Sequence, residues 1–389
     1  MAARVRILIF GFVLLLMLSG ISRLNGGDKV SKENANKSIP ANIADAFGPP
    51  AEYEKNYGGY SSPLLFGDGK EVKTVEDWKR RREEIRKFWE DNLGLWPPLL
   101  KKPDVEELEK TKRDNFLQHR VRIEIAPGKQ TVEGYLLIPE DKGPLPAVVV
   151  VFYDAKTAVG LGKENLDFGY QLARRGFVVL SIGTPDFCRL RPNYKPLCES
   201  SGEAALQPLS ALAYAAANCH TVLAGLPEVD SERIGIMGHS YGGKWAMFGS
   251  CFYEKFACAV WIDPGIVFDE NRPNVNYWEP WYLGWESGKQ RKSGVPSKDK
   301  PRTGAYKKLF EGGHDLHEVH ALMAPRPFLV SGGSEDMVER WKALNHTIAV
   351  NDILGHKNRV AMTNRKGHTP TPESNSQIYN FFEHFLKSN

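Results

Sequence analysis

The chain has 389 residues, of which 42% are hydrophobic and 25% are charged. These values are close to the globular average and argue against a disordered, collagenous or coiled-coil chain. The 51 Lys and Arg residues exceed the 47 Asp and Glu residues by a net charge of only +4, which gives no support for nucleic-acid binding. Five cysteines in a chain of this length argue against a disulfide-built scaffold, and their spacing matches no common metal motif.

The first residues have the pattern of an export signal. Arg4 and Arg6 precede an apolar run at residues 7–18, and the small residues Ser19 and Gly20 follow it. This run is shorter than the roughly 20 apolar residues that a membrane-spanning helix needs. A basic start with a short apolar middle is typical of a signal peptide. We expect a signal peptide at residues 1–26, a secreted or periplasmic location, and no stable membrane anchor after cleavage.

Residues 27–115 are expected to form an extended N-terminal wrap with one helix. The helix is predicted within residues 74–96, where a capping box at Thr74 and Asp77 begins it and Gly94 ends it. Its apolar face would carry Trp78, Ile85, Trp89 and Leu93. We interpret the charged residues of the opposite face as a solvated surface with ion pairs one turn apart.

From residue 116 to residue 389 the pattern alternates between strands and helices. Strands are predicted at 119–125, 133–139, 146–153, 177–183, 233–240, 257–263, 326–333 and 359–364, and helices at 168–176, 206–226, 242–252 and 375–388. Strands that alternate with helices through short connections predict an α/β fold with a mostly parallel central sheet covered by helices on both faces. The long segment at 271–313, rich in aromatic and then basic residues, is expected to be a lid or a binding loop.

The pentapeptide Gly238-His239-Ser240-Tyr241-Gly242 fits the G-x-S-x-G pattern of a nucleophile elbow. It follows a predicted strand and opens a predicted helix, which is the context that the motif requires. We therefore predict that Ser240 is a nucleophile. The amide of Tyr241, at the start of the helix, would then stabilise the oxyanion.

A serine nucleophile needs a base, and the base needs an acid to orient it. His368 is the best-placed histidine, because it follows the last predicted strand and precedes the final helix. For the acid we favour Asp336, which lies just past the strand at 326–333. Asp263, which ends the strand after the nucleophile helix, is the alternative. The second oxyanion donor is expected in the loop after residues 146–153, near Tyr153 and Asp154.

Residues 75–389 resemble the bacterial carbohydrate esterases of the α/β-hydrolase fold. The resemblance rests on PEVDSERIGIMGHSYGGKWAM, YEKFACAVWIDPG and HEVHALMAPRPFLVSGGSED, and the chain is similar to glucuronoyl esterases and to the acetylxylan esterase and dienelactone hydrolase-like group. Glucuronoyl esterases carry a G-C-S-R-x-G-K elbow, in which Lys244 here matches the lysine that contacts sugar hydroxyls. His239 stands where that family has Cys, and Tyr241 where it has Arg. The aromatic segment that contains Glu279 and Trp281 resembles the family's sugar-facing region, so the resemblance implies Lys244, Glu279 and Trp281 as substrate-binding residues.

We therefore expect a secreted serine esterase that removes acetyl or uronate esters from a polysaccharide or oligosaccharide. It would use Ser240, His368 and an aspartate, without a metal or another cofactor, and without nucleic acid as a partner. One alternative is a serine peptidase of the prolyl-oligopeptidase type, although the chain has no room for a propeller domain. The other is a glycan-binding protein without catalytic activity on a hydrolase frame.

Overall fold

The computed structural model describes residues 38–185 and 206–387. The predicted signal peptide lies outside these residues. Within the described ranges, no helix is long and apolar enough to span a bilayer.

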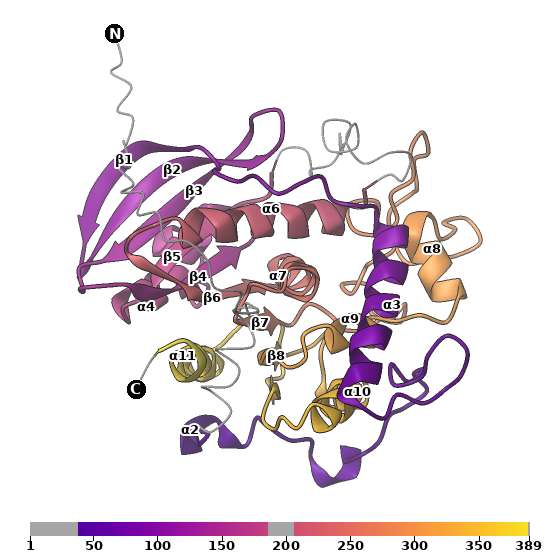
Figure 1. The fold of residues 1–389 in the computed structure, drawn as a ribbon. Coiled ribbons are helices and arrows are strands. Elements are labelled where there is room, and N and C mark those ends of the chain that lie inside the picture. The colour runs from indigo at the N-terminus through magenta and orange to yellow at the C-terminus, as the bar shows by residue number, and fades with distance from the viewer. Residues whose placement is uncertain (1–37, 186–205, 388–389) are drawn as a thin grey trace, which may run out of the picture.

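A single nine-stranded sheet organises the described chain, in the order β1-β2-β3-β5-β4-β6-β7-β8-β9 (Figure 1). The six strands from β5 to β9 in this order are mutually parallel, and the first three join them through antiparallel pairs. The strands are β1 Val105–Arg113, β2 Phe116–Ala126, β3 Gln130–Pro139, β4 Leu145–Val151, β5 Val178–Ile182, β6 Val229–His239, β7 Cys258–Ile262, β8 Phe328–Gly332 and β9 Val360–Asn364. The expected mostly parallel central sheet is thus confirmed.

Helices cover both faces of this sheet, as expected (Figure 1). Along β4, Ala147, Val149 and Val151 pack into the core beneath α6 and α7, while Val148 and Val150 pack into the core that holds α4 and α11. This alternation is why the strand is a continuous apolar run. The helices are α2 Ala41–Ala44, α3 Val75–Leu93, α4 Phe168–Arg174, α6 Pro208–Ala224, α7 Tyr241–Phe252, α8 Gly304–Glu311, α9 His317–Ala321, α10 Trp341–Ile353 and α11 Pro372–Leu386.

Strand β1 was not expected from the sequence. It lies ahead of residue 116, where the catalytic domain was predicted to begin, and pairs along its length with β2. Its sequence, VEELEKTKR, is almost entirely exposed and highly charged. An edge strand needs no apolar face on its solvent side, so hydrophobic alternation does not reveal it.

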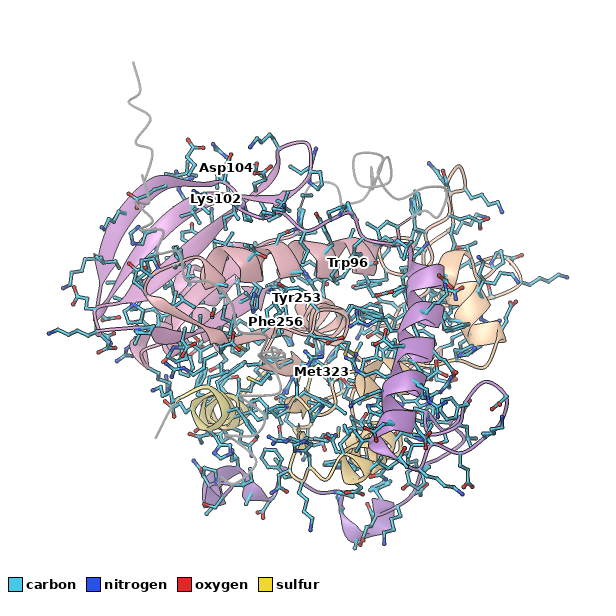
Figure 2. All side chains as sticks on the ribbon, viewed as in Figure 1. Trp96, Lys102, Asp104, Tyr253, Phe256 and Met323 are labelled. Atoms are coloured by element: carbon cyan, nitrogen blue, oxygen red, sulfur yellow. The ribbon has the colours of Figure 1, made fainter. Side chains whose placement is uncertain are left out.

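Helix α3 follows the prediction at both ends. Thr74 and Asp77 form the capping box, and Gly94 ends the helix with a φ of 84°. The buried side chains are the four that the spacing selected, Trp78, Ile85, Trp89 and Leu93. After the helix, the Trp96 indole donates to the Ser210 hydroxyl of α6 at 2.9 Å (Trp96 is labelled in Figure 2).

Part of the charged face of α3 contacts the rest of the protein as well as solvent. Arg82 and Arg86 both donate to the Glu254 carboxylate, at 2.7 and 2.6 Å. They also reach main-chain carbonyls of the hydrolase core, Leu322 for Arg82 and Phe252 for Arg86. These two arginines therefore fasten the helix to the core, and the interpretation as a purely solvated face was wrong for them.

Candidate active site

The strand β6 turns into helix α7 through Ser240, whose φ is 56° and ψ is −112°. A non-glycine residue rarely adopts a positive φ, and such strain is typical of a functional turn. The turn requires glycine at both flanks. A Cβ on Gly242 would lie 2.0 Å from the Val151 carbonyl oxygen, and one on Gly238 would lie 2.2 Å from the Gly242 carbonyl oxygen.

Backbone bonds hold the nucleophile residue in place. The Ser240 amide donates to the Ile262 carbonyl oxygen at 2.8 Å, which ties the turn to the end of β7. Ser240 remains partly exposed, while Tyr241 next to it is buried and opens α7. A substrate can therefore reach the serine from the edge where the parallel strands end.

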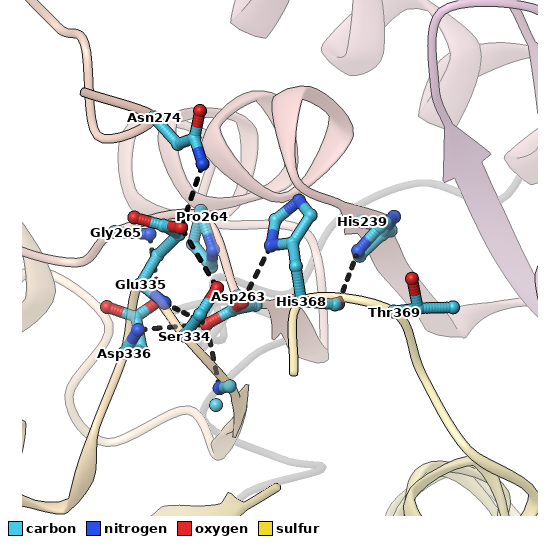
Figure 3. A network of polar contacts seen from close by, with 12 residues as sticks. His239, Asp263, Pro264, Gly265, Asn274, Ser334, Glu335, Asp336, His368 and Thr369 are labelled. Carbon is cyan, nitrogen blue, oxygen red and sulfur yellow. Dashed lines mark hydrogen bonds and ion pairs between the residues drawn. The ribbon is translucent and has the colours of Figure 1, made fainter. Parts of the chain in front are cut away.

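His368 lies on the loop between β9 and α11, and its Nδ1 is 2.7 Å from Oδ2 of Asp263 (Figure 3). Because an ionised carboxylate only accepts, Nδ1 carries the proton in this pair and Nε2 is left as the basic nitrogen. The other oxygen of Asp263 accepts from the amides of Gly333, Glu335 and Asp336, at 2.7, 3.1 and 2.8 Å. Burial acts to raise the pKa of Asp263, but the bonds from His368 and from the Asp336 amide outweigh it, and the pKa is lowered.

Asp336, the acid favoured from the sequence, is placed elsewhere. Its two oxygens accept from the amides of Gly265 and Ile266, at 2.8 and 2.6 Å, and it is fully buried. Burial and the neighbouring charge of Asp263 raise the pKa of Asp336 to about 6. Asp263 directly follows β7, whereas Asp336 comes after a further turn that carries it beneath the loop after β7. The geometry thus departs from the preferred expectation and pairs His368 with the alternative, Asp263.

Two donors hold the main chain of His368. The His239 Nε2 donates to the His368 carbonyl oxygen at 3.0 Å, and the Arg365 guanidinium donates to the same oxygen at 2.6 Å. Arg365 also donates to the carbonyl oxygens of Ser331 and Gly332 at the end of β8. Arg365 was not predicted as a site residue, although its position three residues before His368 on one short loop could have indicated it.

The His239 ring is neutral. Burial, with the nearby His368, lowers its pKa to about 3. Its Nε2 donates to a carbonyl oxygen, so Nδ1 is unprotonated, and that atom has no hydrogen-bond partner among the described residues. A small cavity beside the ring is lined mostly by apolar side chains, including Val150, Leu166 and Phe168, which offer no acceptor to a second ring proton.

The loop after β4 carries the residues expected to supply the second oxyanion donor. The Asp154 carboxylate accepts from the Thr157 amide at 2.9 Å and from the Thr157 hydroxyl at 3.1 Å, so this side chain caps the turn. Its main-chain amide, and that of Tyr153, stay as predictions for the oxyanion site. The Tyr153 ring is exposed and stacks on the ring of Tyr241.

Two of the three expected substrate-binding side chains point inward. The Lys244 Nζ is buried, donates to the carbonyl oxygens of Pro264 and Asn274, and lies over the rings of Tyr277 and Tyr282. Burial lowers the pKa of Lys244 to about 8. This side chain holds the loop after β7 and does not face a substrate. The reason is its place in the first turn of α7, on the side that packs against that loop.

Glu279 is likewise buried. Its carboxylate accepts from the Gly294 amide at 2.6 Å and pairs with Arg291. The expectation that it binds substrate therefore does not fit, because its acceptors are used within the segment itself. Trp281 is half-buried at the margin of the core, and its role in substrate binding stays a prediction.

Comparisons with known proteins agree with the fold described above. The family model described as dienelactone hydrolase family matches residues 132–269, and the C-terminal model of the BAAT and acyl-CoA thioester hydrolases matches residues 214–363. A glucuronoyl esterase from Solibacter usitatus is 16% identical, with a TM-score of 0.65, over 85% of this chain and 98% of the other. The chain has the α/β-hydrolase fold.

Two further glucuronoyl esterases share this α/β-hydrolase fold. The protein from Caldicellulosiruptor kristjansonii is 20% identical, with a TM-score of 0.61, over 85% of this chain and 91% of the other. The catalytic domain from Hypocrea jecorina is 14% identical, with a TM-score of 0.57, over 84% of this chain and 88% of the other. A search of curated proteins finds no significant match. Among the described residues of this hydrolase fold, no group of three or more His, Cys, Asp or Glu side chains could hold a metal ion.

Proposed function

We propose that this α/β hydrolase is an exported serine esterase that removes acetyl or uronate esters from polysaccharides or oligosaccharides. The observation that carries the proposal is the pairing of His368 with Asp263 at 2.7 Å, on the same sheet edge as the strained turn at Ser240. Acyl transfer requires an imidazole oriented by a carboxylate at the same sheet edge as a serine on such a turn. The carbohydrate part of the proposal is supported by the resemblance to glucuronoyl esterases.

In the proposed reaction, the Ser240 oxygen attacks the ester carbonyl carbon while Nε2 of His368 takes the hydroxyl proton. Asp263 keeps Nδ1 protonated and stabilises the imidazolium that forms. The tetrahedral oxyanion is stabilised by hydrogen bonds from the Tyr241 amide and from an amide of the loop at Tyr153 and Asp154. His368 then donates its proton to the leaving alcohol. Water attacks the acyl-enzyme by the same steps and releases the acid.

Export is proposed from residues 1–26 alone, whose basic and apolar pattern is that of a signal peptide. A polymeric sugar ester lies outside the cytoplasm, so the location and the substrate class agree. N-terminal sequencing of the protein recovered from the periplasm or the medium tests this part, since a mature chain that still begins at Met1 contradicts it.

The activity is tested by labelling and by a substrate panel. A fluorophosphonate probe should label the wild-type protein, and S240A should lose the label. The panel contains an acetylated xylan, a methyl glucuronate ester and a short peptide amide, with S240A as the matched inactive control. We expect hydrolysis of at least one sugar ester. Cleavage of the amide alone would replace the proposal with a peptidase, and failure to label would favour a binding protein.

A further inference from the structure

The ring of Tyr153 lies beside the nucleophile. Strands β4 and β6 are parallel neighbours in which Val151 is opposite Gly238. Two residues further along each chain, Tyr153 and Ser240 leave the sheet at the same edge. Neighbouring strands are about 4.8 Å apart, and α7 approaches so closely that a Cβ on Gly242 would collide with the Val151 carbonyl. The main chain of Tyr153 is therefore a direct neighbour of the serine turn.

The Tyr153 ring is held in one orientation. It stacks on the Tyr241 ring, with centroids 4.7 Å apart and planes at 15°, and the Phe152 ring lies at 73° to it with centroids 5.0 Å apart. Its hydroxyl interacts with the side chain of Tyr282, which is buried. One face of the ring is thus covered, and 55% of the residue remains exposed.

Exposure alone does not mark a site, because single apolar side chains are common on protein surfaces. The position of this ring next to the serine turn is what indicates a site. Among the described residues, the exposed large aromatic side chains are Tyr57 and Tyr153. Tyr57, in the N-terminal wrap, packs on His346 of α10 and not on the serine turn. Of the side chains expected to bind sugar, Lys244 and Glu279 are turned inward and Trp281 is half-buried, so Tyr153 is the more exposed aromatic side chain near Ser240.

We propose that Tyr153 is the platform of a sugar subsite, on which the pyranose ring that carries the ester stacks its apolar face. This inference rests on the proposed esterase function and names the part of the substrate that the site binds. An aromatic face is electron-rich and matches the weakly positive C–H groups of a pyranose face, and a ring that is already fixed loses little conformational freedom on binding. A simple alkyl ester has no group for this platform.

Binding is measured apart from turnover in the S240A background. The ligands are methyl glucuronate and acetylated xylotriose, and the affinity is measured by calorimetry. Adding Y153A should weaken binding about tenfold or more, the scale of one aromatic contact, while Y153F and Y153W should largely keep it. Y57A is the matched control, because it removes an exposed tyrosine elsewhere. Equal affinity of the Y153A and Y57A variants, or no binding of either ligand to S240A, overturns the proposal.

Turnover gives the second measurement. The ratio of kcat/KM on the sugar ester to kcat/KM on ethyl acetate should fall about tenfold in Y153A, because KM for the sugar ester rises. In Y153F this ratio should stay close to the wild-type value. A large loss of kcat on both esters in Y153F would assign the hydroxyl to the oxyanion and overturn the platform. If the wild type neither labels with fluorophosphonate nor hydrolyses any ester, the proposed function fails, and the calorimetry still decides whether the sugar subsite exists.

Discussion

Single residues decide the chemistry at the edge of the sheet, and the two buried aspartates show how. Asp263 accepts from the amides of the loop that carries Asp336, and Asp336 accepts from the amides of the loop that follows Asp263. Each carboxylate thus fixes the backbone around the other. Only Asp263 has an oxygen directed at His368, so the same residue type at the same edge serves two different purposes.

The first prediction separates these purposes. In D263N, the side-chain oxygen can still accept the three hydrogen bonds from main-chain amides. The NH₂ group of the new asparagine is then turned toward Nδ1 of His368. The imidazole must then protonate Nε2, which removes the base, and kcat should fall by about 10³ to 10⁴. In D336N, one of the two amides loses its acceptor, which should lower the free energy of unfolding by about 1 to 3 kcal/mol with a far smaller loss of kcat.

Ester hydrolysis and urea denaturation of both aspartate variants check this prediction. The assignment of Asp263 is wrong if D336N abolishes kcat while D263N retains it. Folding of D263N should be compared with the wild type by circular dichroism, so that a loss of activity is not a loss of structure.

The second prediction concerns His239 as a positioning residue. It is neutral, and its Nε2 holds the carbonyl of His368. In H239A, Arg365 is left as the other donor to that oxygen, so we expect a loss of about tenfold in kcat with little change in KM. Gln keeps a donor of similar reach, and H239Q should recover most of the activity. An H239A variant with unchanged kcat, or an H239Q variant as impaired as H239A, would contradict a positioning role.

Among the larger elements, the segment between β7 and α8 has no regular secondary structure over residues 263–303 apart from one isolated bridge. Ion pairs hold it. The Glu279 and Arg291 side chains are only 5% and 2% exposed, and Arg291 also donates to the carbonyl oxygens of Gly294 and Pro301. Arg302 binds both carboxylate oxygens of Glu270. The sequence predicted a loop over residues 271–313, but its last part forms helix α8. These contacts give the irregular part a fixed shape, and its role as a lid or a binding loop stays a prediction.

The third prediction tests that fixed shape. E279Q removes the counter-charge of the buried Arg291, and breaking a buried pair should lower the free energy of unfolding by about 3 kcal/mol. The matched control is K87A on α3, which breaks the exposed pair of Lys87 with Asp91 and should cost less than about 0.5 kcal/mol. Chemical denaturation at neutral pH measures both. Equal effects of E279Q and K87A would mean that the buried pair does not hold the segment.

At the scale of the whole molecule, we expect stability to depend on pH, because burial lowers the pKa of histidines such as His220. His220 is 2% exposed, lies against the rings of Tyr253 and Phe256 (both labelled in Figure 2), and its Nε2 donates to the Lys255 carbonyl oxygen. Burial lowers the pKa of His220 to about 4. The unfolded chain binds a proton at this residue below its ordinary pKa of 6.5, and the folded chain does not until about pH 4.

The fourth prediction follows because the pKa of His220 is lower in the folded chain than in the unfolded chain. The stability that His220 contributes is complete above pH 6.5 and is lost progressively as the pH falls toward 4. Between pH 7 and pH 5 the loss from this residue should be about 2 kcal/mol. Gln keeps the bond to the Lys255 carbonyl and does not titrate, so H220Q should lose that much less stability over the same interval. Urea denaturation at both pH values measures the difference, and parallel curves for wild type and H220Q would contradict the prediction.

Local sequence patterns predicted most of this fold because their cause is local. The capping box of α3, the apolar run of β4 and the glycines around Ser240 depend on neighbours a few residues away, and the structure has each of them where the sequence analysis expected. Strand β1 was missed because an exposed edge carries no apolar pattern. His239 was given no role from the sequence because it binds a main-chain carbonyl, which residue type does not reveal. Arg365 binds the same carbonyl, and only its position close to His368 in the chain could have indicated this.

The sequence by itself determined the α/β class of this protein, the position of the serine turn and the candidate histidine. The choice between Asp263 and Asp336 required the tertiary structure, because both follow parallel strands at the same edge, and only the path of the loops after β7 and β8 sets which carboxylate reaches His368. The same holds for Lys244 and Tyr153. Whether such an amphipathic side chain turns inward or toward a substrate depends on the segment that packs over it, and that segment is distant in the chain.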